Sequence, residues 1–273
     1  MSPAVAEPVE HRAPAGEGEE AAGAAGPLFA LHDIGKTFAN GTVALDGLDF
    51  TVGRHAFVSL LGPSGCGKST VLRLIAGLTR PSRGRLVWHR QIARGDIGFV
   101  FQEPTLMPWA TVFDNVRLPL RLQGRGRQEV REEVERALAM VGLEEFAGAY
   151  PRELSGGMKM RASIARALVT RPRLLLMDEP FAALDEITRF KLNNELLDLW
   201  ARENWTVVFV THSVYESVYL SQRILVMASR PGRITAEIPI DAPYPRDEAF
   251  RLSPAYTEAC RRVSAELRRA MGE

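Results

Sequence analysis

Several features that would narrow the function are scarce in this chain of 273 residues. Its two cysteines, Cys66 and Cys260, are too few and too far apart for a disulfide framework or a cysteine metal site, which fits a reducing cytosol. No run approaches the roughly 18 apolar residues of a membrane span, and the N-terminus has no basic-then-apolar signal pattern. We therefore expect the chain itself to stay out of the membrane.

Charge of one sign is also lacking. The formal net charge is +1, whereas a protein that binds a polyanion usually carries a basic excess or a basic stripe. This balance argues against nucleic acid as a partner. Lysine is rare among the cations, so each lysine is more informative than one of the many arginines; the lysines are Lys36, Lys68, Lys159 and Lys191.

The residues that are present divide the chain into a tail, a main unit and a short end. Residues 1–26 contain Ala, Gly, Glu and Pro with almost nothing to bury, which predicts a disordered tail. In residues 27–246, short β-type runs alternate with helical patterns, which indicates an α/β fold with a largely parallel sheet. Residues 247–273 are expected to add a short, arginine-rich helix.

The elements of the main unit can be placed by their periodicity and their turn signals. Strands are expected at 28–34, 43–52, 55–62, 173–180, 206–212, 223–228 and 234–240, and a further strand is expected to end at Gln102. Helices are expected at 69–78, 127–146, 156–169 and 186–203.

The strongest chemical signal is GPSGCGKST at residues 62–70, which follows an apolar strand and opens a helix, as a phosphate-binding loop does. Glycines let successive backbone N–H groups wrap the phosphates, and the helix N-terminus adds positive partial charge. Lys68 would reach the β- and γ-phosphate oxygens, and Ser69 would offer its hydroxyl to Mg²⁺. The predicted nucleotide-binding residues of this loop are Gly62, Pro63, Ser64, Gly65, Cys66, Gly67, Lys68, Ser69 and Thr70.

A buried strand at LLLMDEP ends in two carboxylates, Asp178 and Glu179. In a nucleotide site, Asp178 would join the Mg²⁺ shell and Glu179 would polarise the attacking water. Taken alone, Asp-Glu after an apolar strand can simply begin a loop. The phosphate-binding loop upstream favours the catalytic interpretation.

A second anion-binding helix end is predicted at LSGGM. Ser155 is a natural N-cap, and Gly156 and Gly157 leave backbone amides bare at the start of a helix. An ordinary capped helix would explain the serine equally well. Because the first loop already holds the phosphates, a second amide cluster makes most sense if it serves the nucleotide of another subunit.

These motifs, in this order, resemble the ATP-binding subunits of ABC transporters over roughly residues 28–240. The resemblance rests on GPSGCGKST, the glutamine of VFQ, LSGGM, LLLMDEP, ALD at 183–185 and THS with His212. It implies a P-loop NTPase fold with a mainly parallel core sheet, an N-terminal antiparallel β-subdomain and a helical subdomain inserted at about 103–165. It also implies ATP and Mg²⁺ as cofactors, ATP hydrolysis, and two copies that close head to tail.

The same resemblance assigns roles to four further residues. Phe38 would stack on adenine, unless it is an ordinary core residue. Gln102 would contact Mg²⁺ and the attacking water, Asp185 would lie at the seam between two copies, and His212 would contact the γ-phosphate. The predicted metal ligands are thus Ser69, Gln102 and Asp178, and the predicted catalytic residues are Glu179, His212 and Gln102.

Two stretches resemble one subgroup of the family. PTLMPWATVFDNV after Gln102 and SRPGRI at 229–234 look like the subunits of importers for nitrate, sulfonate, taurine, bicarbonate or thiamine precursors. This implies integral-membrane permease subunits as partners, an extracytoplasmic solute-binding protein acting indirectly, and a location at the cytoplasmic face of the membrane. Met158 and Ala183 depart from the glutamine and serine that many relatives have at these positions.

The loop after Gln102 leaves two interpretations open. Leu106, Met107 and Trp109 could pack inside the helical subdomain, or they could line a groove that receives a cytoplasmic helix of the permease.

Two other functions fit the sequence less well than the importer subunit. A soluble ABC-type ATPase switch in DNA maintenance or translation would need two fused cassettes or a coiled-coil insertion between Lys68 and Asp178, which this sequence lacks. A P-loop small-molecule kinase would explain neither LSGGM nor His212.

Overall fold

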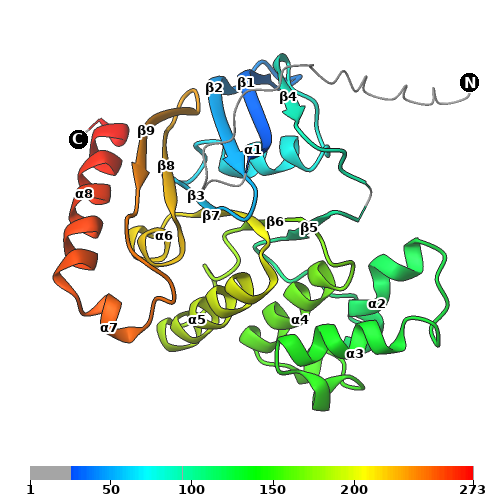
Figure 1. The fold of residues 1–273 in the computed structure, drawn as a ribbon. Helices are drawn as coiled ribbons and strands as arrows, with labels where there is room; N and C mark the ends of the chain where they lie inside the picture. Colours follow the sequence, from blue (N-terminus) through cyan, green and yellow to red (C-terminus); the bar gives the residue numbers. More distant parts are fainter. Residues whose placement is uncertain (1–25, 94, 273) are drawn as a thin grey trace, which may run out of the picture.

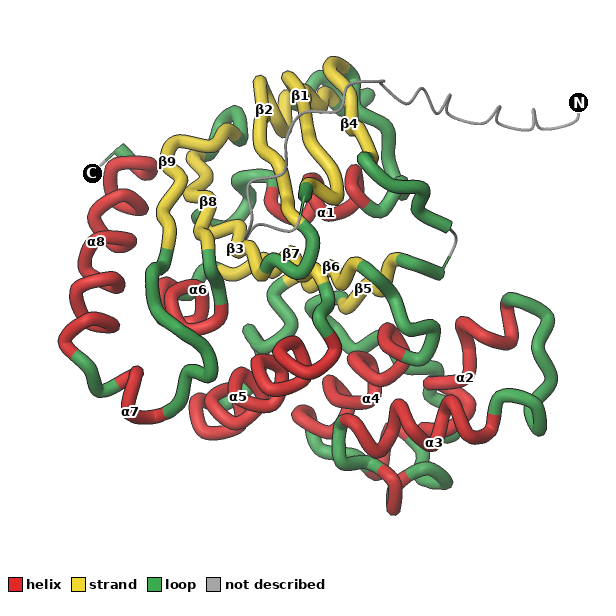
Figure 2. The backbone as a smooth tube through the Cα atoms, in the orientation of Figure 1, coloured by secondary structure: helices red, strands yellow, loops and turns green. Residues whose placement is uncertain are grey.

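The structure, a computed structural model, describes residues 26–93 and 95–272. All but the last residue of the tail predicted at 1–26 therefore lies outside the described residues. In the described part of the chain, a six-stranded sheet forms the central layer. A three-stranded sheet and one helix cover one face of this layer, and a set of helices covers the other face (Figures 1 and 2).

The central sheet has the strand order β5-β6-β7-β3-β8-β9, and only β9 runs antiparallel to its neighbour. The mainly parallel sheet is thereby confirmed. Because the carboxyl ends of parallel strands meet at one edge, the segments that follow these strands come together there. The strands are β3 (Phe57–Leu61), β5 (Ile97–Val100), β6 (Leu174–Asp178), β7 (Thr206–Thr211), β8 (Arg223–Ala228) and β9 (Arg233–Pro239).

The smaller sheet is the predicted antiparallel β-subdomain. It consists of β1 (Pro27–Thr37), β2 (Val43–Gly53) and β4 (Arg83–Trp88) in the order β2-β1-β4. Helix α1 (Lys68–Ile75) shares one hydrophobic core with this sheet and with one face of the central sheet. The subdomain therefore lies directly behind the segment that contains the phosphate-binding loop.

The other face of the central sheet packs against helices. Along β6, Leu174 and Leu176 face the core of α1, whereas Leu175 and Met177 face these helices, as the alternation along a strand requires. The helices are α2 (Val112–Leu122), α3 (Arg131–Met140), α4 (Gly156–Leu168), α5 (Glu186–Glu203) and α6 (Val214–Leu220), with short 3-10 turns at Glu144–Phe146 and Pro151–Glu153.

Three sequence-based boundaries were wrong. The helical pattern at 127–146, expected to end near Gly142, forms only α3: the helix starts at Arg131 and not at Arg127, and it ends at Met140, just before Gly142 with its φ of 65°. Helix α1 stops three residues before the expected end, just ahead of Gly77 with its φ of 70°. Strand β5 ends at Val100, so Gln102 lies two residues beyond the strand rather than at its end.

Helix α2 was not predicted at all. Thr111 caps it by accepting a hydrogen bond from the Asp114 N–H, but Pro119 lies inside the helix. Proline is strongly disfavoured within helices, so the sequence looked more irregular than it is.

The C-terminal segment is larger than the single short helix expected there. It forms α7 (Glu248–Arg251) and the 18-residue α8 (Pro254–Met271), which runs beside β9 in Figure 1. Tyr256, Cys260 and Val263 form the buried face of α8.

Arg246 anchors this segment to the rest of the fold. The residue is 4% exposed, and its guanidinium lies 4.2 Å from the ring centre of Tyr244. It caps the end of α6 by donating hydrogen bonds to backbone carbonyl oxygens there and in the loop after β9. The acceptors are Val218, Tyr219, Ser221, Ile240 and Ala242.

Replacing Arg246 by methionine should lower the free energy of unfolding by about 3 kcal/mol or more, since each buried acceptor left without a donor costs roughly 1–3 kcal/mol. Urea unfolding followed by circular dichroism measures this. The control is Arg261→Met on α8, whose ion pair with Glu258 is exposed to solvent and should therefore contribute little to stability. Equal losses in the two variants would contradict the anchoring role.

Candidate functional site

The predicted phosphate-site residues meet at the carboxyl edge of the central sheet. The phosphate-binding loop follows β3, Asp178 and Glu179 lie at the end of β6, and His212 follows β7. In the sheet these three strands are neighbours, in the order β6-β7-β3. The fold thus joins three motifs that are far apart in the sequence.

The phosphate-binding loop has the backbone that its chemistry requires. Gly67 has a φ of 99°, a conformation that residues with a Cβ rarely adopt, and it directly precedes Lys68 at the start of α1. The first turn of α1 has no acidic residue and no side-chain cap. Its backbone N–H groups and the positive end of its dipole are therefore available to an anion.

Lys68 folds back over the loop. It is 4% exposed, and its ammonium donates hydrogen bonds to the carbonyl oxygens of Gly62, at 2.8 Å, and Pro63, at 3.0 Å. These bonds hold the positive charge inside the loop that the backbone amides surround.

Ser69 and Asp178, two of the predicted metal ligands, form a hydrogen-bonded pair. The Ser69 hydroxyl donates to Asp178 Oδ1 at 2.9 Å, and Asp178 is buried. Burial raises the pKa of Asp178, while the hydrogen bond from Ser69 opposes this effect. A hydroxyl and a carboxylate oxygen side by side fit a hard cation such as Mg²⁺, which binds proteins through one or two such groups and keeps waters and phosphate oxygens as its other ligands.

No preformed metal cage accompanies this pair in the described ranges. No group of three or more His, Cys, Asp or Glu side chains could hold a metal ion among residues 26–93 and 95–272. Gln102, the third predicted ligand, is exposed and lies two residues beyond β5, at the same edge of the sheet.

Glu179 links two of the strand ends. One carboxylate oxygen lies 3.4 Å from the Lys68 ammonium, and the other lies 2.9 Å from Nδ1 of His212. Glu179 itself has a φ of 45°, a left-handed conformation that is uncommon for non-glycine residues. The residue predicted as base and the residue predicted to contact the γ-phosphate are thus direct neighbours.

The support of His212 is a feature that sequence reasoning missed. The Thr211 hydroxyl donates to Glu216 Oε2 at 2.5 Å and accepts a hydrogen bond from the Ser213 N–H at 2.9 Å. Ser213 caps α6, and Glu216 follows three residues later, a spacing that signals a capping box. The capping-box spacing in SVYE would have predicted that Glu216 supports the start of α6. In the structure, the Glu216 carboxylate does so through the Thr211 hydroxyl.

LSGGM lies beside the predicted seam residue. Ser155 caps α4 by accepting from the Met158 N–H, and Asp185 caps α5 by accepting from the Thr188 N–H, a bond that lowers the pKa of Asp185. A Cβ on Gly157 would lie 2.8 Å from a methyl group of Thr188. The two helix starts are therefore packed closely together, with Ser155 and Asp185 both exposed.

Phe38 and Trp109 are exposed, whereas other apolar residues of the loop after Gln102 are partly buried. Phe38 lies in the turn between β1 and β2 and is 42% exposed, so its interpretation as a core residue was wrong. Trp109 is 77% exposed, whereas Leu106 packs against the hydrophobic core. Met107 is half-buried, and its backbone N–H donates to the side chain of Asn115.

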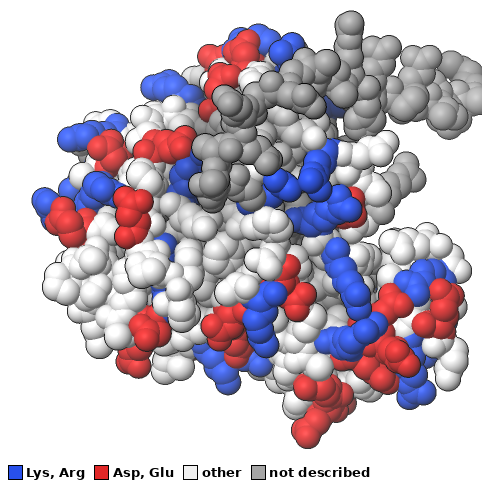
Figure 3. Space-filling model, in the orientation of Figure 1, with Lys and Arg blue, Asp and Glu red and all other residues white. Residues whose placement is uncertain are grey.

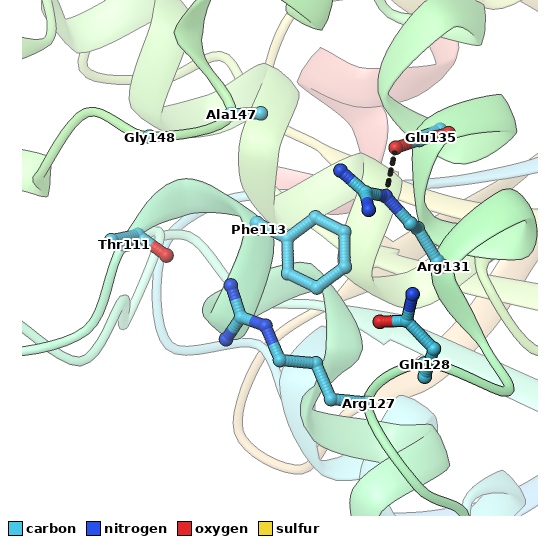
Figure 4. A pocket seen from close by; sticks show the side chains of 8 residues that line it. All are labelled: Thr111, Phe113, Arg127, Gln128, Arg131, Glu135, Ala147 and Gly148. Atoms are coloured by element: carbon cyan, nitrogen blue, oxygen red, sulfur yellow. Dashed lines mark hydrogen bonds and ion pairs between the residues drawn. The ribbon is translucent and has the colours of Figure 1, made fainter.

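A hollow of ≈ 270 Å³ lies next to this loop, between α2 and α3 (Figure 4). The Arg127 guanidinium lies over the ring of Phe113 at 4.6 Å and is paired with Asp114, and Arg131 is paired with Glu135 at 2.9 Å. Basic and acidic side chains alternate over this part of the surface (Figure 3). The hollow therefore offers an aromatic wall with a mixed-charge rim, which suits a protein segment better than a polyanion.

None of the helices among residues 26–93 and 95–272 has the length and apolarity that a membrane crossing requires.

Comparison with known proteins gives consistent matches. The family model described as ABC transporter matches residues 45–182. The chain is 49% identical over 226 residues to a putative ATP-binding protein of Brucella abortus, covering 82% of this chain and 87% of that one. It is also 49% identical to an aliphatic sulfonates import ATP-binding protein of Pseudomonas syringae pv. syringae, with 78% and 85% of the two chains covered.

Among solved structures, the chain resembles the ATP-binding cassette MJ0796 in a dimeric, post-hydrolysis state bound to ADP and Pi. The TM-score is 0.69 at 34% identity, and the match covers 79% of this chain and 100% of the other.

The support of His212 generates a prediction about pH. Burial raises the pKa of Glu216, so the folded state holds this proton at pH values where the unfolded chain has released it. The stability of the wild type relative to Glu216→Gln should therefore be highest below about pH 4.3, the ordinary glutamate pKa. It should fall as the pH rises through the raised pKa of the folded state.

Urea unfolding of both proteins at several pH values measures this difference. Glu129→Gln is the control, because the hydrogen bond from Arg125 lowers the pKa of the exposed Glu129. The stability of the wild type relative to this variant should therefore rise with pH. If the stability of the wild type relative to Glu216→Gln instead increased with pH, a raised pKa of Glu216 in the folded state would be contradicted.

Proposed function

The chain belongs to the ABC transporter family and is an ATP-hydrolysing subunit that energises an importer, and on this premise we propose how its residues do so. The observation that carries the proposal is the position of Glu179, which contacts both Lys68 and His212 beside the Ser69–Asp178 pair. These five side chains lie at the carboxyl edge of the central sheet, beside the N-terminus of α1.

ATP binding is assigned to the loop at residues 62–70. The backbone amides at the start of α1 would receive the β- and γ-phosphates, and Lys68 would neutralise part of their charge. Phe38, exposed in the β1–β2 turn, would stack on the adenine. Mg²⁺, when bound, would neutralise developing charge on the phosphates, and Ser69, Asp178 and Gln102 would hold it.

Hydrolysis is assigned to Glu179 and His212. Glu179 would accept a proton from the water that attacks the γ-phosphorus, and His212, 2.9 Å from it, would hold the γ-phosphate in line. Thr211 and Glu216 fix the backbone on both sides of His212. The base and its neighbour are thus positioned before the reaction, which lowers the cost of assembling them.

The second half of the site would come from another copy of the chain. The amides of Gly156 and Gly157 and the Ser155 hydroxyl lie at the start of α4, whose core is on the opposite face of the central sheet from α1. A head-to-tail dimer would bring this helix end to the nucleotide of the partner, with Asp185 at the seam. Similarity to a dimeric cassette supports this arrangement.

The transported solute would be an aliphatic sulfonate or a related small organic anion. This proposal is supported by the relative named for import of aliphatic sulfonates. Permease subunits in the membrane and an extracytoplasmic solute-binding protein would select the solute, and this chain would bind the permease from the cytoplasmic face of the membrane.

We assign permease docking to the exposed loop at Trp109 and to the hollow beside it. Trp109 lies two residues before Thr111, which lines the hollow together with Phe113. A large exposed aromatic side chain next to an aromatic-walled recess is typical of a protein-binding surface. Movement of the permease would then be coupled to the loop that begins at Gln102.

Replacing Glu179 by glutamine should lower ATP turnover by about 100-fold or more, the range for losing a general base, while ATP still binds. Phosphate release and the binding of a fluorescent ATP analogue measure the two effects. Glu237→Gln is the control, since this carboxylate lies on β9 and pairs with Arg223 at the start of β8, away from the site. Full turnover in the Glu179 variant would exclude its role as base.

Replacing Trp109 by alanine should weaken co-purification with the permease and reduce transport by about tenfold, because truncation of a central interface aromatic typically costs more than 1 kcal/mol. ATP binding by the isolated subunit should be unchanged. Leu122→Ala is a matched control, since Leu122 is 78% exposed and is the last residue of α2, the helix that follows the Trp109 loop. Loss of folding, or equal effects of the two substitutions, would count against docking at Trp109.

A further inference from the structure

The motif SRPGRI at 229–234 is not used by the site described above. It forms the turn between β8 and β9, and this turn lies against the back of the phosphate-binding loop. We propose that Gly232 is a positioning residue for ATP binding, because it alone lets this turn press against the loop and fix its shape. The inference rests on the assignment of residues 62–70 as the ATP site.

Gly232 is closer to the loop than any other residue type could be. A Cβ at this position would lie 2.2 Å from the carbonyl oxygen of Cys66 and 2.8 Å from that of Ala44. Both neighbours are backbone atoms, which cannot swing aside as a flexible side chain can. Gly232 is buried, and its φ lies outside the left-handed region, so the need for glycine comes from space and not from backbone conformation.

The start of β2 completes the contact. The Gly232 N–H donates to the carbonyl oxygen of Ala44, and the Asp46 N–H donates to the carbonyl oxygen of Gly232, both at 3.0 Å. These two bonds enclose Leu45, which is 1% exposed. A Cβ on Gly67 would lie 2.5 Å from a methyl group of Leu45, so β2 carries the contact on to the residue before Lys68.

The same hairpin also contacts the start of the loop. A Cβ on Gly62 would lie 2.7 Å from the carbonyl oxygen of Met227, the second-last residue of β8 before SRPGRI. Gly62 at the start of the phosphate-binding loop and Cys66 in its middle are therefore both in close contact with one continuous segment.

The contact between the β8–β9 turn and the phosphate-binding loop should affect the affinity for ATP. Backbone amides bind a phosphate only in the curved arrangement in which several of them point at one place, and small displacements weaken several bonds at once. Strand β2, which begins at Val43 and contacts Gly232, directly follows the turn that contains Phe38. The β8–β9 turn thus sets the position of the phosphate-binding loop relative to the residue assigned to the adenine.

The first test is Gly232→Ala. The added Cβ should push the loop out of place and raise both the Kd and the KM for ATP at least tenfold, with a much smaller change in kcat at saturating ATP. A merely structural role would lower the melting temperature without changing the Kd of the folded protein. Gly126→Ala is the matched control, since a Cβ there meets nothing within 4 Å and its φ is not positive. Unchanged ATP affinity in folded Gly232→Ala would overturn the proposal.

The second test uses the wild type, so that it stands even if the variant does not fold. Binding of ADP or ATP should slow amide hydrogen exchange in a peptide covering residues 229–234 together with one covering 62–70. A peptide covering 238–242, at the far end of the same hairpin, should not change. If nucleotide protected the peptide at 62–70 but not the peptide at 229–234, the positioning role of Gly232 would be overturned, while the assignment of the ATP site would stand. Absence of ATP binding by the wild type would overturn the site assignment itself.

Discussion

The active-site arrangement depends on the carboxylate of Glu179, which joins the ends of three neighbouring strands. Its two oxygens contact the ammonium that follows β3 and the imidazole that follows β7, while the carboxylate itself follows β6. Each partner comes from a different part of the chain, so only the parallel order β6-β7-β3 can place them together.

The contacts behind these side chains form a continuous chain of support. His212 is fixed by Thr211 and Glu216 at the start of α6, and the end of α6 is capped by the buried guanidinium of Arg246. Arg246 in turn leads into α7 and α8. The start of the C-terminal segment therefore supports α6 and, through it, the residue that we propose contacts the γ-phosphate.

What the sequence could predict was set by local chemistry. GPSGCGKST, Asp178 with Glu179, and the cap at Ser155 each carry their signal within a few residues, and the structure places all of them at helix or strand ends. The contact of Glu179 with His212 could not be derived in this way, because it depends on the order of strands in space.

Other features were hidden for different physical reasons. Helix α2 was missed because Pro119 lies inside it, and the exposure of Trp109 was left open because apolar periodicity cannot distinguish a core side chain from one at an interface. The need for glycine at position 232 was invisible as well, since it arises from two backbone segments that the sequence does not show to be neighbours.

The phosphate-binding loop is held differently on its two sides. On its front, Lys68 contacts carbonyl oxygens and Glu179 through polar contacts, which can be exchanged for phosphate oxygens at little net cost. On its back, Gly62 and Gly232 each lie too close to a backbone carbonyl oxygen to leave room for a Cβ, and Gly67 lies equally close to a methyl group of Leu45. Atoms packed this closely resist displacement. Binding of ATP would therefore rearrange the front of the site and the loops that follow β5, β6 and β7, while the phosphate-binding loop keeps its place. Of these, the loop after β5 begins with Gln102 and leads to the exposed Trp109, so the rearrangement would be directed toward the surface assigned to the permease.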